Sequence, residues 1–158
     1  MKVSAVLGYD VFLVAGQSNT YFGKTNDATS VPDSVADSTD SDILQIGRFD
    51  SQNNQVILAE EPLDHIGNAG VRPASDTVGW ALAFAKTYKE KGHLGSGRKI
   101  LLVPVGDGGT GFAENDWNEN DPNYDDAIAR VGVAMAAGSD TNILKGIQGD
   151  EVITAEAK

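Results

Sequence analysis

The sequence predicts a single α/β domain over residues 1–158, with a central parallel sheet covered by helices on both faces. Two segments with helical periodicity, 76–91 and 124–137, alternate with three nearly continuous apolar segments of strand length. Such alternation is typical of parallel sheets built from βαβ units. The chain has 158 residues, of which 41% are hydrophobic, so it can bury one core. The apolar segments are 11–15, 99–105 and 143–148.

The first apolar segment leads into the strongest functional signal. It stops at Gly16 and is followed by Gln17, Ser18 and Asn19, a hydroxyl flanked by two amides. A buried parallel strand would deliver Ser18 to the carboxyl edge of the sheet, where open α/β sheets place their sites. A serine at that place is a helix N-cap, a phosphate ligand or a nucleophile, and the strand alone does not decide between them.

A long polar segment separates this strand from the first helix. Residues 24–42 are rich in Asp, Ser and Thr and predict a surface loop. Short strands at 43–46 and 55–59, joined by the polar turn 50–54, predict a hairpin or a single strand with an excursion. Asp64 and His65 follow in another loop. Because sequence neighbours rarely orient one another as a catalytic triad requires, a structural role is favoured for both.

Both helices have recognisable ends. For the first, Ser75 is the expected N-cap, Gly92 lies just past the end, and an apolar stripe is expected to be buried. That stripe consists of Val78, Ala81, Leu82, Ala85 and Tyr88. For the second, Gly138 is the stop, and the residues expected to point inward are Ile128, Val131 and Met135.

Composition excludes several classes of function. A formal net charge of -11 and a pI near 4.4 argue against a nucleic-acid-binding surface, which needs clustered Lys and Arg. The chain has no cysteine and two histidines, so we expect no metal centre and no cofactor built on thiolates or clustered imidazoles. Neither a signal peptide nor a membrane span is visible, and localisation stays open.

Two glycine-rich segments imitate nucleotide sites. Six residues separate Gly16 from Gly23, where a phosphate-binding loop has four. The segment 106–111 satisfies G-x-G-x-x-G after a strand, but 112–118 does not look like the start of a helix. A nucleotide-binding domain is therefore kept only as the weakest of three functional hypotheses.

The three strand ends together carry the groups that acyl transfer needs. Ser18 supplies a hydroxyl for attack, the turn of Gly108, Gly109 and Thr110 supplies backbone N–H groups, and Gln148 supplies an amide donor. Because parallel strands end at one edge, we expect these groups to meet there as a serine with an oxyanion hole.

These motifs resemble the successive blocks of the SGNH hydrolase superfamily. Its most similar branch is the sialate O-acetylesterase and carbohydrate esterase family 6 type. The resemblance rests on the order of three blocks along nearly the whole chain. They are 16–19, 108–110 with Trp117 downstream, and 148–150.

The resemblance implies a fold, an activity and residue roles. The fold is a flavodoxin-like α/β/α sandwich, here C-terminally shortened, and the activity is removal of acetyl groups from sugar hydroxyls without a metal. Ser18 would be the nucleophile and, through its own N–H, part of the oxyanion hole. Gly108 or Gly109 and the Gln148 amide would be the other donors. Thr110 and Trp117 would line the sugar site, although Trp117 could equally be a lid over the core.

The sequence also departs from the family pattern. The family's catalytic histidine, with an aspartate three residues before it, has no counterpart here, and neither His65 nor His93 sits at its position. Two hypotheses follow besides the nucleotide-binding one. Either the domain is an active carbohydrate esterase completed by a missing segment or a partner chain, or it is a carbohydrate-binding or structural surface module, such as a viral coat or tail component.

The last strand carries an expectation about partners. If it forms the edge of the sheet, its apolar side chains lack cover, and exposed strand edges invite pairing. We expect another subunit or protein to cover Leu144 and Ile147, or the helix over them.

Overall fold

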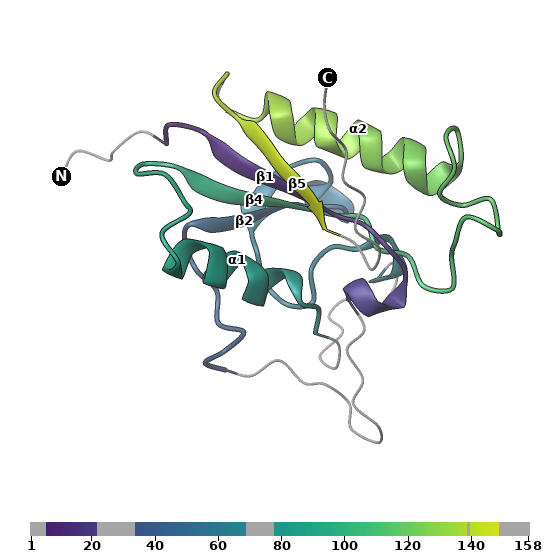
Figure 1. The fold of residues 1–158 in the computed structure, drawn as a ribbon, viewed down its shortest axis with the longest axis horizontal. Coiled ribbons are helices and arrows are strands. Elements are labelled where there is room, and N and C mark those ends of the chain that lie inside the picture. The colour runs from purple at the N-terminus through teal and green to yellow at the C-terminus, as the bar shows by residue number, and fades with distance from the viewer. Residues whose placement is uncertain (1–5, 22–33, 69–77, 139, 149–158) are drawn as a thin grey trace.

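A five-stranded sheet forms the middle layer of the molecule (Figure 1). The computed structural model describes residues 6–21, 34–68, 78–138 and 140–148. The strand order is β3-β2-β4-β1-β5, and all strands are parallel except β3, which is antiparallel to β2. The predicted strands and the hairpin are therefore confirmed. Their bounds are β1 (Tyr9–Val14), β2 (Ile43–Ile46), β3 (Val56–Leu58), β4 (Lys99–Pro104) and β5 (Ile143–Gln148).

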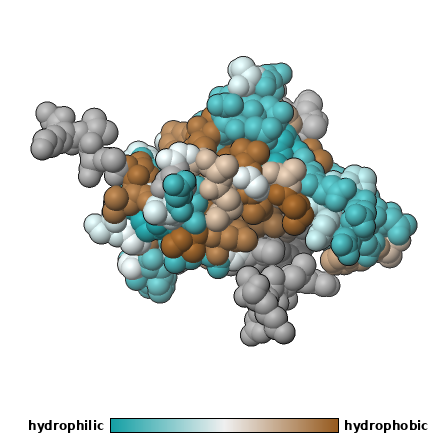
Figure 2. All heavy atoms as spheres, turned by 90° about the horizontal axis from the view of Figure 1, so that it is seen from above, coloured by the Kyte–Doolittle hydropathy of each residue, from teal (hydrophilic) through white to brown (hydrophobic). Residues whose placement is uncertain are grey.

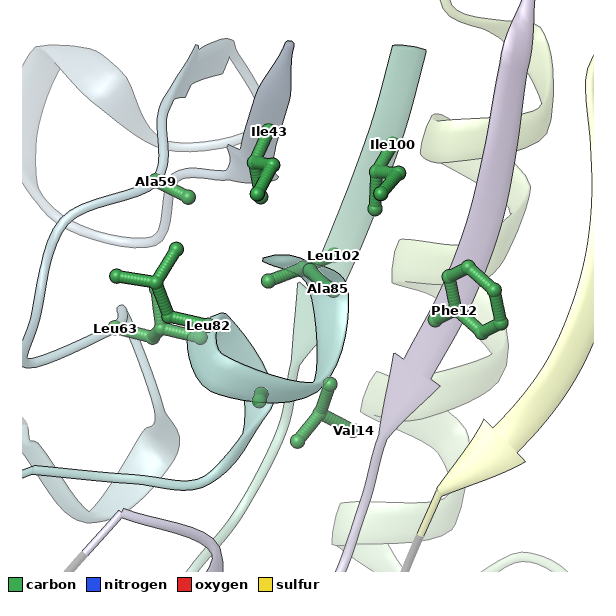
Figure 3. Packing of buried hydrophobic residues seen from close by; sticks show 10 residues of the cluster. Phe12, Val14, Ile43, Ala59, Leu63, Leu82, Ala85, Ile100 and Leu102 are labelled. Atoms are coloured by element: carbon green, nitrogen blue, oxygen red, sulfur yellow. The ribbon is translucent and has the colours of Figure 1, made fainter. Parts of the chain in front are cut away.

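The side chains of the central strands alternate between two cores. On β1, Phe12 and Val14 face helix α1 (Ala81–Glu90), whereas Val11 and Leu13 face helix α2 (Pro122–Ala136). β4 alternates in the same way. Figure 3 shows the first core, where strand residues meet Leu82 and Ala85 of α1. The fold is thus the expected three-layer α/β/α arrangement, in which a central strand is apolar along its length because both of its faces are buried.

Helix α1 begins five residues later than predicted, at Ala81, while the predicted cap Ser75 lies outside the described residues. Trp80 occupies the N-cap position and makes no side-chain cap. A carboxylate from a distant loop acts there instead, because Oε2 of Glu61 accepts the Gly79 N–H at 3.1 Å. An anion at a helix N-terminus is stabilised by the unpaired N–H groups and the helix dipole.

Helix α2 corrects two predictions. It begins at Pro122 rather than 124, with Asp121 as N-cap, since proline at the first helical position is favourable. Ile128, predicted to point inward, is 55% exposed. The buried positions belong to smaller or hydrogen-bonded side chains, which let the helix approach the sheet closely. They are Asn123, Ala127, Arg130 and Ala134.

Strand β5 lies at an edge of the sheet, and its first two residues are exposed on opposite faces. Leu144 pairs with Val11 and so faces the α2 side, yet it is 43% exposed. Ile143 pairs with Asp10, faces the α1 side and is 44% exposed. Figure 2 shows the molecule from above the view of Figure 1, with hydrophobic residues gathered across the centre of the surface turned toward the viewer. Within the described ranges, neither helix has the length and apolar character needed to cross a bilayer.

We predict that the Glu61 carboxyl makes stability depend on pH. Burial raises the pKa of Glu61, although the N–H groups of Gly79, Leu63 and Leu82 oppose the rise. A raised native pKa means that the folded protein holds the Glu61 proton more tightly than the unfolded chain does. The stabilisation that results is fully present below the pKa of Glu61 in the unfolded chain, and it is lost as pH rises through the pKa in the folded protein. Glu61→Gln should therefore be more stable than the wild type at neutral pH, and this advantage should shrink on acidification.

The measurement is the free energy of unfolding from denaturant titrations between about pH 4 and pH 8. Glu60→Gln is the matched control, because Glu60 is the exposed neighbour. An equal pH response of both variants would contradict the prediction.

Candidate active site

Ser18 lies at the carboxyl edge of the sheet, directly after its central strand. β1 ends at Val14, and the short 3-10 helix η1 (Ser18–Thr20) follows. The N-cap position of η1 belongs to Gln17, so Ser18 is not the capping residue. Ser18 is half-buried, and no hydrogen bond of its hydroxyl is found with any described residue. Within this part of the chain, its oxygen is therefore not used in a structural hydrogen bond.

The turn after β4 lies against Ser18. The Asp107 N–H donates to the Gly16 carbonyl at 2.9 Å, which ties this turn to the end of β1. A Cβ placed on Gly108 would lie 3.7 Å from the Ser18 Cβ, so the two backbones are neighbours. Gly109 is exposed and has φ +76°, with no atom within 4 Å of the position of a Cβ. The structure thus brings Ser18 and the predicted glycine turn together.

The position of Gln148 in the sheet is known from its backbone pairing. This residue ends β5 and pairs in register with Val14, which ends β1. The third predicted strand end therefore reaches the same edge as Ser18. Its side chain is outside the described part of the structure, so the donor role of Gln148 stays a prediction, as do the donor roles of the glycines.

Thr110 and Trp117 form one hydrogen-bonded unit. The Trp117 Nε1–H donates to Thr110 Oγ1 at 2.8 Å, and that hydroxyl donates to the Asp107 carbonyl at 2.6 Å. The indole packs against the core on the α2 side. Both residues therefore brace the turn beside Ser18, and their contact with a sugar stays a prediction.

Only glycine fits at position 106. A Cβ there would lie 1.8 Å from Thr20 Oγ1 and 2.8 Å from His65 Nδ1. The Gly106 N–H donates to His65 Nδ1 at 2.8 Å, and the Gly106 carbonyl accepts the Gly67 N–H at 3.0 Å. Three separate segments therefore meet at this residue.

His65 lies beneath the site and is only 1% exposed. Its ring stacks on Tyr21 with centroids 5.4 Å apart. Burial, with a smaller contribution from the positive Arg48, lowers the pKa of His65 to about 3. Since Nδ1 already accepts the Gly106 N–H, the neutral ring carries its proton on Nε2, and no lone pair is left to act as a general base.

Asp64 does not orient the imidazole either. Its Oδ2 accepts the Arg48 backbone N–H at 3.0 Å, and its own N–H donates to the Gln45 side chain at 2.8 Å. The Arg48 guanidinium in turn pairs with Asp126 of α2 at 2.7 Å. Asp64 and His65 therefore serve different parts of the structure, as the structural interpretation predicted.

The second histidine is at the other end of the molecule. His93 follows α1 and stacks beside Tyr88, with ring centroids 5.4 Å apart. The Tyr88 hydroxyl donates to Asp10 at the start of β1, which is the amino edge of the sheet. His93 is therefore remote from Ser18.

The sequence interpretation missed Tyr21. This residue is 7% exposed, and its hydroxyl would lie 1.9 Å from a Cβ on Gly67 and 2.6 Å from one on Gly108. Burial raises the pKa of Tyr21, the Asp107 charge adds to the rise, and the Gly108 N–H opposes it. In the sequence, this contact is marked only by the glycines at 67 and 108. No local pattern indicates that Tyr21 is their partner.

No metal site is evident in the described ranges, where no group of three or more His, Asp or Glu side chains could hold an ion. The chemistry available at this edge is that of a hydroxyl, several backbone N–H groups and a neutral imidazole beneath them.

Comparisons with known proteins agree with this geometry. The family model "Carbohydrate esterase, sialic acid-specific acetylesterase" matches residues 8–151. No curated protein matches the sequence. The solved structure of NanS is similar over 92% of this chain and 54% of its own, with a TM-score of 0.74 and 21% identity. A protein from Arabidopsis thaliana is similar over 90% of this chain and 57% of its own, with a TM-score of 0.65 and 22% identity.

At these identities the two structures show the fold, and this chain spans a little over half the length of each. The family model, in contrast, covers most of the sequence and confirms the SGNH-type resemblance seen in the motifs. The chain therefore belongs to the carbohydrate esterase family of sialic acid-specific acetylesterases.

Proposed function

We propose that this domain binds an O-acetylated carbohydrate at the edge that carries Ser18, and that Ser18 is the nucleophile for the acetyl group. The observation that carries the proposal is the closeness of Ser18 to the glycine turn, where a Cβ on Gly108 would lie 3.7 Å from the Ser18 Cβ, while the Ser18 hydroxyl makes no hydrogen bond with the described residues. Membership of the acetylesterase family supports the choice of ester.

The reaction follows from these positions. The Ser18 oxygen attacks the ester carbonyl while a base removes its proton, and the negative carbonyl oxygen is held by the N–H groups of Ser18 and of Gly109, with the Gln148 amide. Of the two predicted glycines, Gly109 is the proposed donor, because the Gly108 N–H hydrogen-bonds to the Tyr21 hydroxyl. The sugar hydroxyl leaves with a proton, and water then cleaves the acetyl-serine to acetate. Preorganised donors of this kind stabilise charge that appears only in the transition state.

The base has to come from elsewhere than His65 and His93, the two histidines of the sequence. Nδ1 of His65 is occupied, and His93 is at the opposite edge. Loss of one triad member costs about 10⁴- to 10⁶-fold in turnover. Full activity would therefore need an imidazole supplied by a further segment or a partner chain. Without it, the domain would serve as a carbohydrate-binding or structural surface module.

A first experiment measures Ser18 directly. We expect the 158-residue chain to hydrolyse p-nitrophenyl acetate slowly, with an acceleration of at most about 10³-fold over water from the oxyanion donors alone. Ser18→Ala should abolish both this activity and labelling by a fluorophosphonate. Ser96→Ala, in an exposed turn before β4, should leave both unchanged and is the matched control. Rapid turnover that depends on Ser18 would show that a base is already present, and activity unaffected by Ser18→Ala would refute the nucleophile.

A second experiment concerns the open strand β5. The proposed partner, another subunit or a different protein, covers Leu144 and its neighbours, because Ile143 and Leu144 are exposed on opposite faces of this strand. In sedimentation velocity over a dilution series we expect association that Leu144→Glu abolishes. Leu58→Glu, equally exposed at 43% on the opposite edge strand, should retain it. A wild-type protein that remains a monodisperse monomer would contradict self-association.

A further inference from the structure

We propose that His65 is a positioning residue of the Ser18 site, whose neutral ring holds the Gly106 amide and thereby the turn that carries Gly108. The inference rests on the proposed role of Ser18 and extends it to a residue that never touches substrate.

The first line of evidence is the hydrogen bonding of Gly106. This buried residue donates to His65 Nδ1 at 2.8 Å and accepts from the Gly67 N–H at 3.0 Å. Within the described ranges, the bond to His65 is the one hydrogen bond found for this N–H. Two residues further on, Gly108 is the backbone that faces Ser18. A shift at Gly106 therefore moves the donors relative to the nucleophile.

The second line of evidence is the stack on Tyr21. The rings of His65 and Tyr21 lie 27° from parallel, and the Tyr21 hydroxyl reaches the backbone of Gly108. Tyr21 also hydrogen-bonds through its N–H to the Ser18 carbonyl at 3.1 Å. The imidazole therefore contacts both halves of the site, the turn after β4 and the helix that carries Ser18.

The third line of evidence is chemical. A phenyl ring could fill the same space and stack in the same way, but it could not accept the Gly106 N–H. A protonated imidazole could not accept it either, since both ring nitrogens would then be donors. Burial and the charge of Arg48 keep the ring neutral, so the acceptor persists at ordinary pH. A neutral imidazole therefore meets both requirements at this position, since it stacks on Tyr21 and accepts the Gly106 N–H through Nδ1.

The test compares two substitutions at this position. His65→Phe keeps the stack and removes the acceptor, whereas His65→Asn places Oδ1 where Nδ1 was and restores it. Ile43→Val serves as the control for lost core packing. Ile43 is fully buried, and as the first residue of β2 it lies at the amino edge of the sheet, away from Ser18. Unfolding midpoints identify conditions under which the variants are equally folded.

Two readouts are needed. Fluorophosphonate labelling of Ser18 should fall about 10- to 100-fold in His65→Phe, and should stay within about threefold of wild type in His65→Asn. Hydrogen exchange of the Gly106 amide should accelerate in His65→Phe beyond its rate in Ile43→Val, with His65→Asn close to wild type. Equal labelling and exchange in His65→Phe and Ile43→Val would overturn the proposal.

The pH dependence separates positioning from general-base catalysis. Ring-nitrogen NMR should show neutral His65 with its proton on Nε2 throughout about pH 5 to 8, where an unperturbed histidine titrates. A titration of His65 in this range that parallels Ser18 labelling would overturn positioning and identify a base. If the wild type is not labelled at all, Ser18 is not activated in this chain by itself, and the Gly106 exchange rates alone decide the role of His65.

Discussion

Strand β1 hydrogen-bonds to β4 on one side and to β5 on the other, and the two registers bring Val14 level with Pro104 and Gln148. Every group proposed for the chemistry follows from this pairing, because each belongs to the end of one of these strands or to the turn after it. In the order β3-β2-β4-β1-β5, the chain passes β4 on its way from β1 to β2, and passes β1 on its way from β4 to β5. The carboxyl ends of the strands are where open α/β sheets hold their ligands.

Strand pairing alone does not fix the turns to within bonding distance, and buried polar contacts do so. His65 and Gly67 hold Gly106 from the loop side, and Gly16 holds Asp107 from the β1 side. Arg48 fastens the same loop to helix α2, since its Nε–H donates to the Asp64 carbonyl while its guanidinium pairs with Asp126. The Arg48 side chain is 12% exposed and that of Asp126 is 31% exposed, so the pair is partly buried. Removing Asp126 would leave the more deeply placed Arg48 charge with less compensation.

The sequence predicts the parts of this structure that depend on local pattern. Strands β1 and β4 were recognisable because both of their faces are buried, and Ser18 could be placed because a strand ends just before it. The start of α1 could not be predicted, because Glu61, twenty residues before Ala81, provides the carboxylate at the helix N-terminus.

Contacts with distant segments also explain the side chains whose positions were not predicted correctly. Ile128 was assigned inward on periodicity, yet Arg130 occupies the inner face because Gly47 and Asn53 accept its hydrogen bonds. Likewise, nothing near His65 in the sequence indicates that its acceptor nitrogen serves Gly106, which is forty-one residues away. Contacts between distant segments decide these positions, and no pattern within one segment records them.

The edge strand β5 shows two opposing tendencies. Ile143 and Leu144, on opposite faces of the strand, are 44% and 43% exposed, which favours a partner. The register shift opposite Val11 leaves Lys145 as an extra residue, and its ammonium lies 4.0 Å from the buried Asp10 carboxylate. A bulge and a lysine on an edge strand both oppose addition of another strand. The surfaces available for burial are therefore the faces at Ile143 and Leu144, so a partner that packs across these faces fits the structure better than one that extends the sheet.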